Sequence, residues 1–504
     1  MGWAVFGSVS LSYGVPMARI SGFSRQIVAG CGALLFLTVS SSLVVASQQN
    51  VQSRREKVET GLSQRVRIEG RPFEHWTIQE RMRYYHVPGV QIAVIDNGRI
   101  AWTGSYGVTR AGGSQAVNDN TMFEAASVSK VVTALTILRL VDRGSLNLDE
   151  PVAPVLKSWR FPDSAKPVTI RELLSHNAAI NWPAGETALR PSQPIPSNLD
   201  RLLGRAPALN RPVIVDGVPG SGFRYSNGGY LILGQIVTDV RGSDFGKTAE
   251  DLVLKPLQMG RSTFRVMLPS NVDANLAYGH TEDGIEEPEG WRIVGMAEGG
   301  LWTTAHDLAK VVLAIQQSRA GKKGLLSIQL ATQMLTLQNQ QWGLGVAVGG
   351  TNANANFEHD GSTPGYKARL FGYSERGEGV VILTNGDRGG ELVDELMYSV
   401  AAAYNWPDFR VTVRHIVPIP ADKLGAYVGQ YQMAPGAFVA ITAQDGKLFG
   451  EVRGRSKTEL LPDGPDHFFM LNGPTVQFVR SDQGAVEELI FDGNFHAKRV
   501  GENE

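Results

Sequence analysis

Cysteine is almost absent from the sequence: the only one among 504 residues is Cys31, which lies in an apolar segment near the N-terminus. The chain after that segment therefore has no disulfide, no thiolate metal site and no cysteine nucleophile. An excess of charge of one sign is also missing, because the formal net charge is -1. No basic run is interleaved with aromatic residues, so we set nucleic-acid binding aside.

The N-terminal segment has the pattern of a targeting signal. Arg19 and Arg25 precede an uncharged stretch over residues 27–47 that ends with the small pair Val44-x-Ala46. This pattern predicts a secretory signal peptide over residues 1–46 and a periplasmic or extracellular, cell-envelope location. The alternative is a retained membrane anchor, because the stretch is just long enough to span a bilayer.

The rest of the chain is typical of a soluble globular protein, with 42% hydrophobic and 19% charged residues. Residues 47–72 are polar and charged, and we expect them to form a flexible tether. The expected regular elements that follow are a helix over 73–85, strands over 90–95, 100–103, 342–346, 369–372 and 379–384, and a helix over 391–404.

Strands at both ends of a helical middle predict an α+β domain over residues 73–415. It would contain an antiparallel β-sheet flanked by helices, plus a mostly helical subdomain. The Asn97-Gly98 pair between the first two strands indicates a tight hairpin. Residues 416–504 carry short alternating segments separated by turns such as Asp445-Gly446, which predicts a separate small all-β barrel domain.

The first chemical motif is Ser127-x-x-Lys130, which opens an apolar stretch of helical periodicity. Residues three apart lie on one helix face, so the lysine amine can reach the serine hydroxyl. A serine becomes an effective nucleophile when a neighbouring base takes its proton, and a buried lysine can be that base. The spacing occurs only once in the chain, where about two matches are expected by chance, so other motifs must support it.

Two further spacings also occur once each. Tyr225-x-Asn227 precedes an apolar helical run, and a polarised phenol can shuttle a proton to a leaving group. The Asn side chain offers both donor and acceptor to a substrate amide. His359-x-Gly361 stands at a strand edge, where a glycine lets a substrate backbone approach and the next N–H, that of Ser362, can serve an oxyanion.

Residues 73–404 resemble the penicillin-recognising serine hydrolases related to class C β-lactamases and D,D-peptidases. The resemblance rests on the three motifs together with the stretches Leu173-Leu174-Ser175-His176 and Glu298-Gly299-Gly300. The resemblance implies a β-lactamase/transpeptidase-like fold and a reaction without metal or organic cofactor. The C-terminal module resembles the lipocalin-like β-barrel of peptidase-like members of that family.

The resemblance also implies a role for each motif residue. Ser127 would be the acylated nucleophile, Lys130 its general base and Tyr225 the acid/base for the leaving group. Asn227 would hold the substrate amide. The N–H groups of Ser127 and Ser362 would form the oxyanion hole, and His359 and Gly361 would lie on the substrate side.

One departure bears on the substrate, because His359-Asp360-Gly361 stands where β-lactamases and penicillin-binding proteins carry Lys-Thr-Gly. A histidine is mostly neutral above its reference pKa near 6.5, and Asp360 is expected to repel an anion. Members with His-x-Gly act as esterases, D-aminopeptidases or peptidases. We therefore predict an exported serine hydrolase that cleaves an ester or amide bond, in a small molecule or a peptide. The alternatives are a β-lactamase or D-Ala-D-Ala carboxypeptidase, and an inactive binder of cell-wall peptide.

Overall fold

The computed structural model describes residues 48–183, 188–189, 193–265, 275–286, 292–293, 296–434, 437–452, 457–493 and 495–501. The predicted signal peptide or anchor lies outside these residues. The chain divides into a unit of residues 1–53 and a unit of residues 54–504, and the second is described here. Within the described ranges, no helix is both long enough and apolar enough to cross a bilayer.

The elements of the second unit are, in chain order, β1 (Val66–Ile68), α2 (Ile78–Tyr84), β2 (Gly89–Asp96), β3 (Arg99–Gly107), β4 (Phe123–Glu124), η1 (Ala126–Val128), α3 (Ser129–Asp142), α4 (Ile170–Leu174), β5 (Ala188–Leu189), α5 (Asn198–Leu203), α6 (Asn227–Arg241), α7 (Phe245–Ala249), η2 (Glu250–Leu254), β6 (Arg292–Ile293), β7 (Trp302–Thr303), α8 (Ala305–Arg319), α9 (Ile328–Met334), β8 (Ala347–Gly349), η3 (Asn352–Asn354), β9 (Asn356–Thr363), β10 (Tyr366–Tyr373), β11 (Gly379–Thr384), α10 (Gly389–Tyr404), β12 (Thr412–Arg414), η4 (Ala421–Tyr427), β13 (Gly429–Ala434), β14 (Ala437–Gln444), β15 (Lys447–Val452), β16 (Thr458–Gly464), β17 (His467–Phe469), β18 (Thr475–Arg480), β19 (Val486–Phe491) and β20 (Phe495–Val500).

The segment expected to be a tether is folded instead. Residues 54–60 are helical, and β1 pairs in parallel with β12. Val58 and Leu62 are fully buried, so a few apolar side chains hold this polar segment against the rest of the unit. The prediction of a flexible tether over residues 47–72 is therefore wrong, because composition alone conceals how two well-placed apolar residues anchor a charged helix.

The central sheet has six antiparallel strands in the order β3-β2-β11-β10-β9-β8, so both ends of the domain contribute strands as predicted. Asn97 and Gly98 both have positive φ, which matches the right-handed twist of a two-residue hairpin between β2 and β3. The predicted α+β sheet flanked by helices is confirmed.

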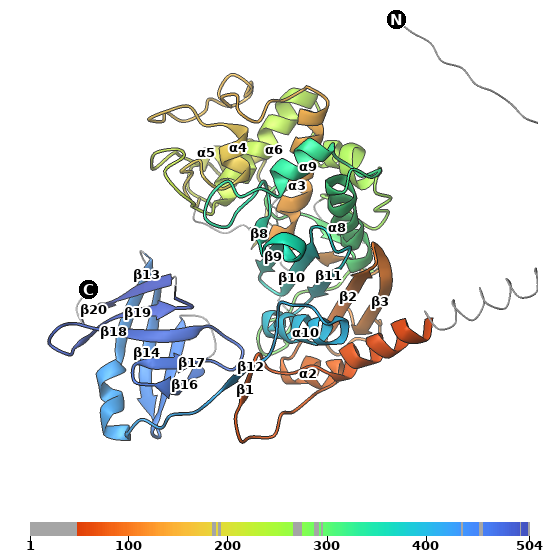
Figure 1. Cartoon of the computed structure of the whole chain (residues 1–504). Coiled ribbons are helices and arrows are strands. Elements are labelled where there is room, and N and C mark those ends of the chain that lie inside the picture. The colour runs from red at the N-terminus through yellow and green to blue at the C-terminus, as the bar shows by residue number, and fades with distance from the viewer. Residues whose placement is uncertain are drawn as a thin grey trace, which may run out of the picture. The chain divides into compact units, whose positions relative to one another are not determined.

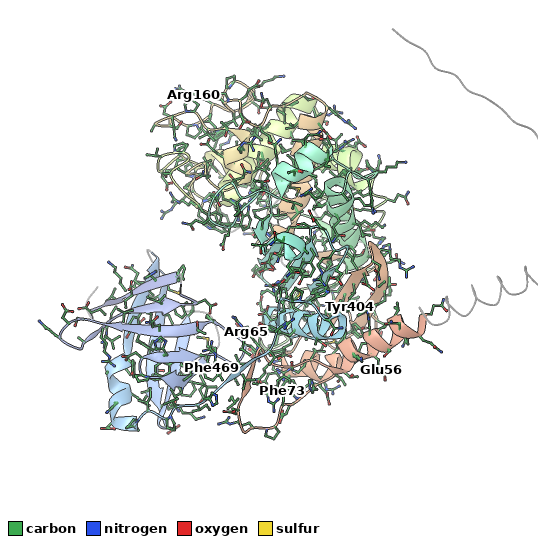
Figure 2. All side chains as sticks on the ribbon, viewed as in Figure 1. Glu56, Arg65, Phe73, Arg160, Tyr404 and Phe469 are labelled. Carbon is green, nitrogen blue, oxygen red and sulfur yellow. The ribbon has the colours of Figure 1, made fainter. Side chains whose placement is uncertain are left out.

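Helices cover both faces of this sheet (Figure 1). On β10, Gly372 lies against Val312 of α8. Arg369, three residues earlier on the same strand, forms an ion pair with Asp394 of α10. Strand residues an odd number of positions apart point to opposite faces, so α8 and α10 pack on opposite sides of the sheet. Tyr404, labelled in Figure 2, ends α10 and accepts a hydrogen bond of 3.0 Å from the indole N–H of Trp102 on β3.

The mostly helical subdomain contains α3 to α7. Its buried hydrophobic side chains form one continuous cluster with those of the central sheet. One predicted strand is missing there, because residues 343–346 form a loop before β8. Gly345 has φ +87, and a Cβ on it would lie 2.2 Å from the Cβ of Ala134 on α3. The glycine therefore allows this loop to pack closely on α3. Neither the apolar alternation nor the Gly-x-Gly spacing in the sequence predicts this contact.

Strands β13 to β20 form a closed eight-stranded antiparallel barrel, which confirms the all-β C-terminal part of the predicted fold. Its interior is a hydrophobic cluster drawn only from residues 424–497, including Tyr431, Phe468 and Phe478. A barrel of eight strands is just wide enough to be filled by its own side chains. The domain boundaries at 415 and 416 stay a prediction.

Candidate active site

Ser127 and Lys130 lie together at the start of α3, a helix that is buried along most of its length. Ser127 is in the 3₁₀ turn η1, which runs directly into α3, and Lys130 is the second residue of α3. The Lys130 Nζ donates to the Ser127 Oγ at 3.0 Å. Lys130 is fully buried, whereas Ser127 is partly exposed. A substrate can therefore reach the hydroxyl, while the amine beside it is shielded from water.

The backbone in front of Ser127 is strained. Ala126 has φ +47, which costs of order 1–3 kcal/mol for a residue other than glycine and persists only where surrounding structure enforces it. The enforcing neighbour is β9: a Cβ on Gly361 would lie 2.3 Å from the Ala125 carbonyl oxygen. Gly361 thus accommodates the chain's own backbone before the serine, and its place on the substrate side stays a prediction.

Tyr225 lies beside the Ser127–Lys130 pair. The Lys130 Nζ is 5.1 Å from the centroid of the Tyr225 ring, which belongs to the segment leading into α6. The ring is partly exposed, with Trp182 stacked on it at 6.1 Å and His176 at 4.2 Å between centroids. Two motifs that are far apart in the sequence are therefore neighbours in space.

His359 faces the same site from β9, and its ring centroid is 6.4 Å from that of Tyr225. Burial, together with the charge of Lys130, lowers the pKa of His359 to about 4, so the ring is neutral at pH 7. Its Nδ1 lies 2.7 Å from the Asp360 carbonyl oxygen, which can only accept, so Nδ1 carries the proton. The buried Nε2, unpartnered within the described structure, is consequently an acceptor.

Asp360 does not face the site. It is opposite Arg369 in the β9–β10 register, and the two side chains form a bidentate ion pair of 2.6 and 2.8 Å. Strand alternation directs Asp360 to the face covered by α10, away from His359. The expectation that Asp360 repels an anionic substrate is therefore wrong, because its charge is on the other side of the sheet and is neutralised by Arg369.

Asn227 and Ser362 complete the set of motif residues. Asn227 is the first residue of α6, and its Oδ1 is buried without a hydrogen-bond partner among the described residues. Ser362 follows Gly361 on β9, and its side chain is exposed. Because Gly361 packs on Ala125, the Ser362 backbone runs next to the turn that carries Ser127. The role of the Ser362 N–H in an oxyanion hole stays a prediction.

Two further residues contribute contacts that sequence reasoning missed. The main-chain carbonyl of Glu298 accepts a 2.6 Å hydrogen bond from Lys130 Nζ, and the Glu298 side chain forms a buried ion pair with Arg201 of α5. His176 contacts Tyr225 and the backbone on both sides of it. Both residues lie in stretches quoted for the resemblance, but neither stretch indicates a partner. No group of three or more His, Cys, Asp or Glu side chains in the described ranges could hold a metal ion.

Comparison with known proteins places this geometry in a family. The Beta-lactamase family profile matches residues 77–405, more than half of the chain. The chain belongs to the Beta-lactamase family. As a member, it is a β-lactamase-related serine hydrolase, which confirms the resemblance drawn from the motifs.

Individual members are distant in sequence. Penicillin-binding protein 4* of Bacillus subtilis (strain 168) is 23% identical over 464 residues, covering 84% of this chain and 97% of its own. Penicillin-binding protein 4 of Amycolatopsis lactamdurans is 29% identical over 340 residues, covering 62% and 86%. A solved octameric penicillin-binding protein homologue from Pyrococcus abyssi superposes with a TM-score of 0.57 at 22% identity, covering 83% and 98%, and shows the shared fold.

Proposed function

We propose that the chain is an exported serine hydrolase that cleaves an ester or amide bond through an acyl-enzyme on Ser127. The observation that carries the proposal is the 3.0 Å hydrogen bond between Lys130 Nζ and Ser127 Oγ. The uncharged form of the Lys130 amine takes the hydroxyl proton as Oγ attacks the substrate carbonyl carbon. The backbone N–H groups of Ser127 and Ser362 stabilise the resulting oxyanion.

Tyr225 supplies the proton that the leaving group needs when the bond to the carbonyl carbon breaks. Its ring already lies over the amine of Lys130, so a proton can pass from serine to leaving group within one cluster. Water then attacks the acyl-enzyme, and the same groups act in reverse to release the acid. This arrangement argues against a catalytically idle peptide binder, which has no need of a paired lysine and tyrosine.

The substrate side of the site favours an amide or peptide with N–H groups over a substrate anchored by a carboxylate. Neutral His359 presents the lone pair of Nε2, and Asn227 presents Oδ1, and both acceptors are buried without partners in the described part of the chain. A buried acceptor costs free energy until a donor reaches it, so a substrate N–H is stabilised there. We therefore propose that His359 accepts a hydrogen bond from a substrate N–H group.

A β-lactamase or D,D-carboxypeptidase is the second candidate, because the relatives from Bacillus subtilis and Amycolatopsis lactamdurans are both named as penicillin-binding proteins. Intact-mass measurement separates the two. Incubation with a fluorophosphonate is expected to give one adduct per chain, and incubation with a penicillin is expected to give an adduct much more slowly. Rapid penicillin acylation would favour the second candidate. Folded protein that forms no adduct with either reagent would contradict both.

A further inference from the structure

The segment that carries Tyr225 is contacted at three points by His176, which follows α4. His176 is 3% exposed and has φ +55, a backbone conformation that few non-glycine residues adopt and in which Asn, Asp and His are enriched. The unusual conformation persists in the buried interior, which indicates that the contacts of this residue outweigh its strain.

These contacts enclose Tyr225 from both sides along the backbone. The N–H of Arg224 donates to the His176 carbonyl oxygen at 2.7 Å, and the N–H of Ser226 donates to the His176 Nδ1 at 3.1 Å. Between these two bonds, the imidazole lies 4.2 Å from the Tyr225 ring, with 33° between the planes. The backbone before the phenol, the backbone after it and one face of its ring thus all rest on the same residue.

The protonation state of His176 follows from these bonds. Because Nδ1 accepts from a backbone N–H, the single ring proton must be on Nε2, so the imidazole is neutral. Burial, then the charge of Lys130 and the neighbouring His359, hold the pKa of His176 well below its usual 6.5. A protonated ring would lose the bond to Ser226 and place a second cation near Lys130.

We propose that His176 is a positioning residue for the acid/base Tyr225: it fixes the phenol against Lys130, so that the proton reaches the leaving group. This rests on the proposed function and adds to it a residue that does not touch the reacting atoms. Further ring contacts of His176, to Tyr230 and Trp342 at 5.2 Å and to Phe223 at 6.0 Å, anchor the imidazole itself.

Leaving-group chemistry tests the proposal. A nitrophenolate departs as a stable anion, whereas an alkoxide must be protonated as it leaves, so only the alkyl ester depends on Tyr225. His176→Phe keeps a ring and loses the acceptor. It should lower kcat/KM for an alkyl ester about tenfold or more, and for the nitrophenyl ester of the same acid less than about threefold. His176→Asn keeps an acceptor and tolerates positive φ, so it should recover part of the loss.

Two comparisons make the outcome decisive. His280 is another fully buried histidine with two backbone contacts, to Ala111 and Asn385, and His280→Asn should leave the ratio between the esters unchanged. In a Tyr225→Phe background, His176→Asn should add little further loss, because both changes affect one proton transfer. The proposal would be overturned if a His176 variant lost kcat/KM equally on both esters, or if the losses of the two single variants multiplied in full in the double variant. If His176→Phe does not fold, the ratio of the two kcat/KM values in His176→Asn decides alone.

Failure of the proposed function gives a different result. Fluorophosphonate labelling releases fluoride, which needs no proton from a phenol, so the His176 variants should still be labelled at Ser127. Wild-type protein that is not labelled there would refute the acyl-enzyme, whereas labelled variants with an unchanged ester ratio would refute only the role of His176.

Discussion

The amine of Lys130 donates to the main-chain carbonyl of Glu298 across 2.6 Å, which joins helix α3 to the stretch before β7. The same Glu298 forms an ion pair with Arg201, and both side chains are at most 5% exposed. Lys130, the general base of the proposed reaction, is thus held by the main-chain carbonyl of Glu298. Glu298 is in turn fixed by its buried ion pair with Arg201.

Glu298→Gln is expected to destabilise the fold, because it leaves the Arg201 guanidinium buried without its anion. Breaking one partner of a buried pair typically costs about 3–5 kcal/mol, whereas replacing both partners with apolar residues is often neutral. Urea unfolding should therefore show a large loss for Glu298→Gln and a smaller one for the double variant Arg201→Met/Glu298→Leu. Equal losses in the two proteins would contradict this account.

Ser127→Ala should abolish labelling by a fluorophosphonate, while Ser129→Ala should keep it. Ser129 is the matched control because it is fully buried and its Oγ is occupied, donating to the Ala126 carbonyl and accepting from the Leu301 N–H. Peptide mapping after labelling locates the adduct. A label on Ser129, or a Ser127→Ala protein that still reacts, would move the nucleophile elsewhere.

Lys130→Ala and Tyr225→Phe should each lower alkyl ester turnover about 10²–10⁴-fold, the usual cost of removing a proton-transfer group. Tyr230→Phe is the control for the phenol, because Lys130 Nζ is also only 5.5 Å from the Tyr230 ring centroid. The Tyr230 hydroxyl donates to the Leu174 carbonyl, so its loss should reduce stability by about 1 kcal/mol and leave turnover nearly unchanged. Similar kinetics in the two tyrosine variants would remove Tyr225 from its assigned role.

His359 should make the fold less stable as the pH falls. Its pKa is about 4 in the folded chain and near 6.5 when unfolded, so between these values the unfolded chain binds more protons. Lowering the pH from 7 to 4 should therefore cost about 3 kcal/mol of unfolding free energy through this residue. Thermal or urea unfolding across that range should show a smaller loss for His359→Gln than for wild type. Parallel pH profiles would mean that the ring is not neutral in the fold.

His359→Lys is expected to shift selectivity towards β-lactams. A charge-assisted hydrogen bond is worth about 1.5–3 kcal/mol, whereas the acceptor Nε2 of His359 offers no hydrogen bond to a carboxylate, so penicillin acylation relative to neutral-ester cleavage should rise roughly tenfold or more. Asp360→Thr alone should leave this ratio unchanged, because Asp360 pairs with Arg369 on the opposite face of the sheet. Wild-type protein that turns over penicillins faster than neutral esters at pH 8 would falsify the assignment of an uncharged His359 to the substrate side of the site.

Local sequence was sufficient for features that depend on near neighbours. The spacing of Ser127 and Lys130 predicts their contact because residues three apart share a helical face, and Asn97-Gly98 predicts its hairpin because both residues tolerate positive φ. Alternation along β9 also separates Asp360 from His359, because adjacent strand residues point to opposite faces. Order and uniqueness of the three motifs then indicated the family.

Tertiary structure decided what depends on contacts between distant segments. Nothing in the sequence states that Glu298 holds Lys130, that His176 supports Tyr225, or that Gly361 accommodates the backbone of Ala125, because each contact joins segments separated by tens to hundreds of residues. The protonation of His359 has the same origin. Its residue type sets a reference pKa, whereas burial and the charge of Lys130 on helix α3, both products of folding, keep the ring neutral.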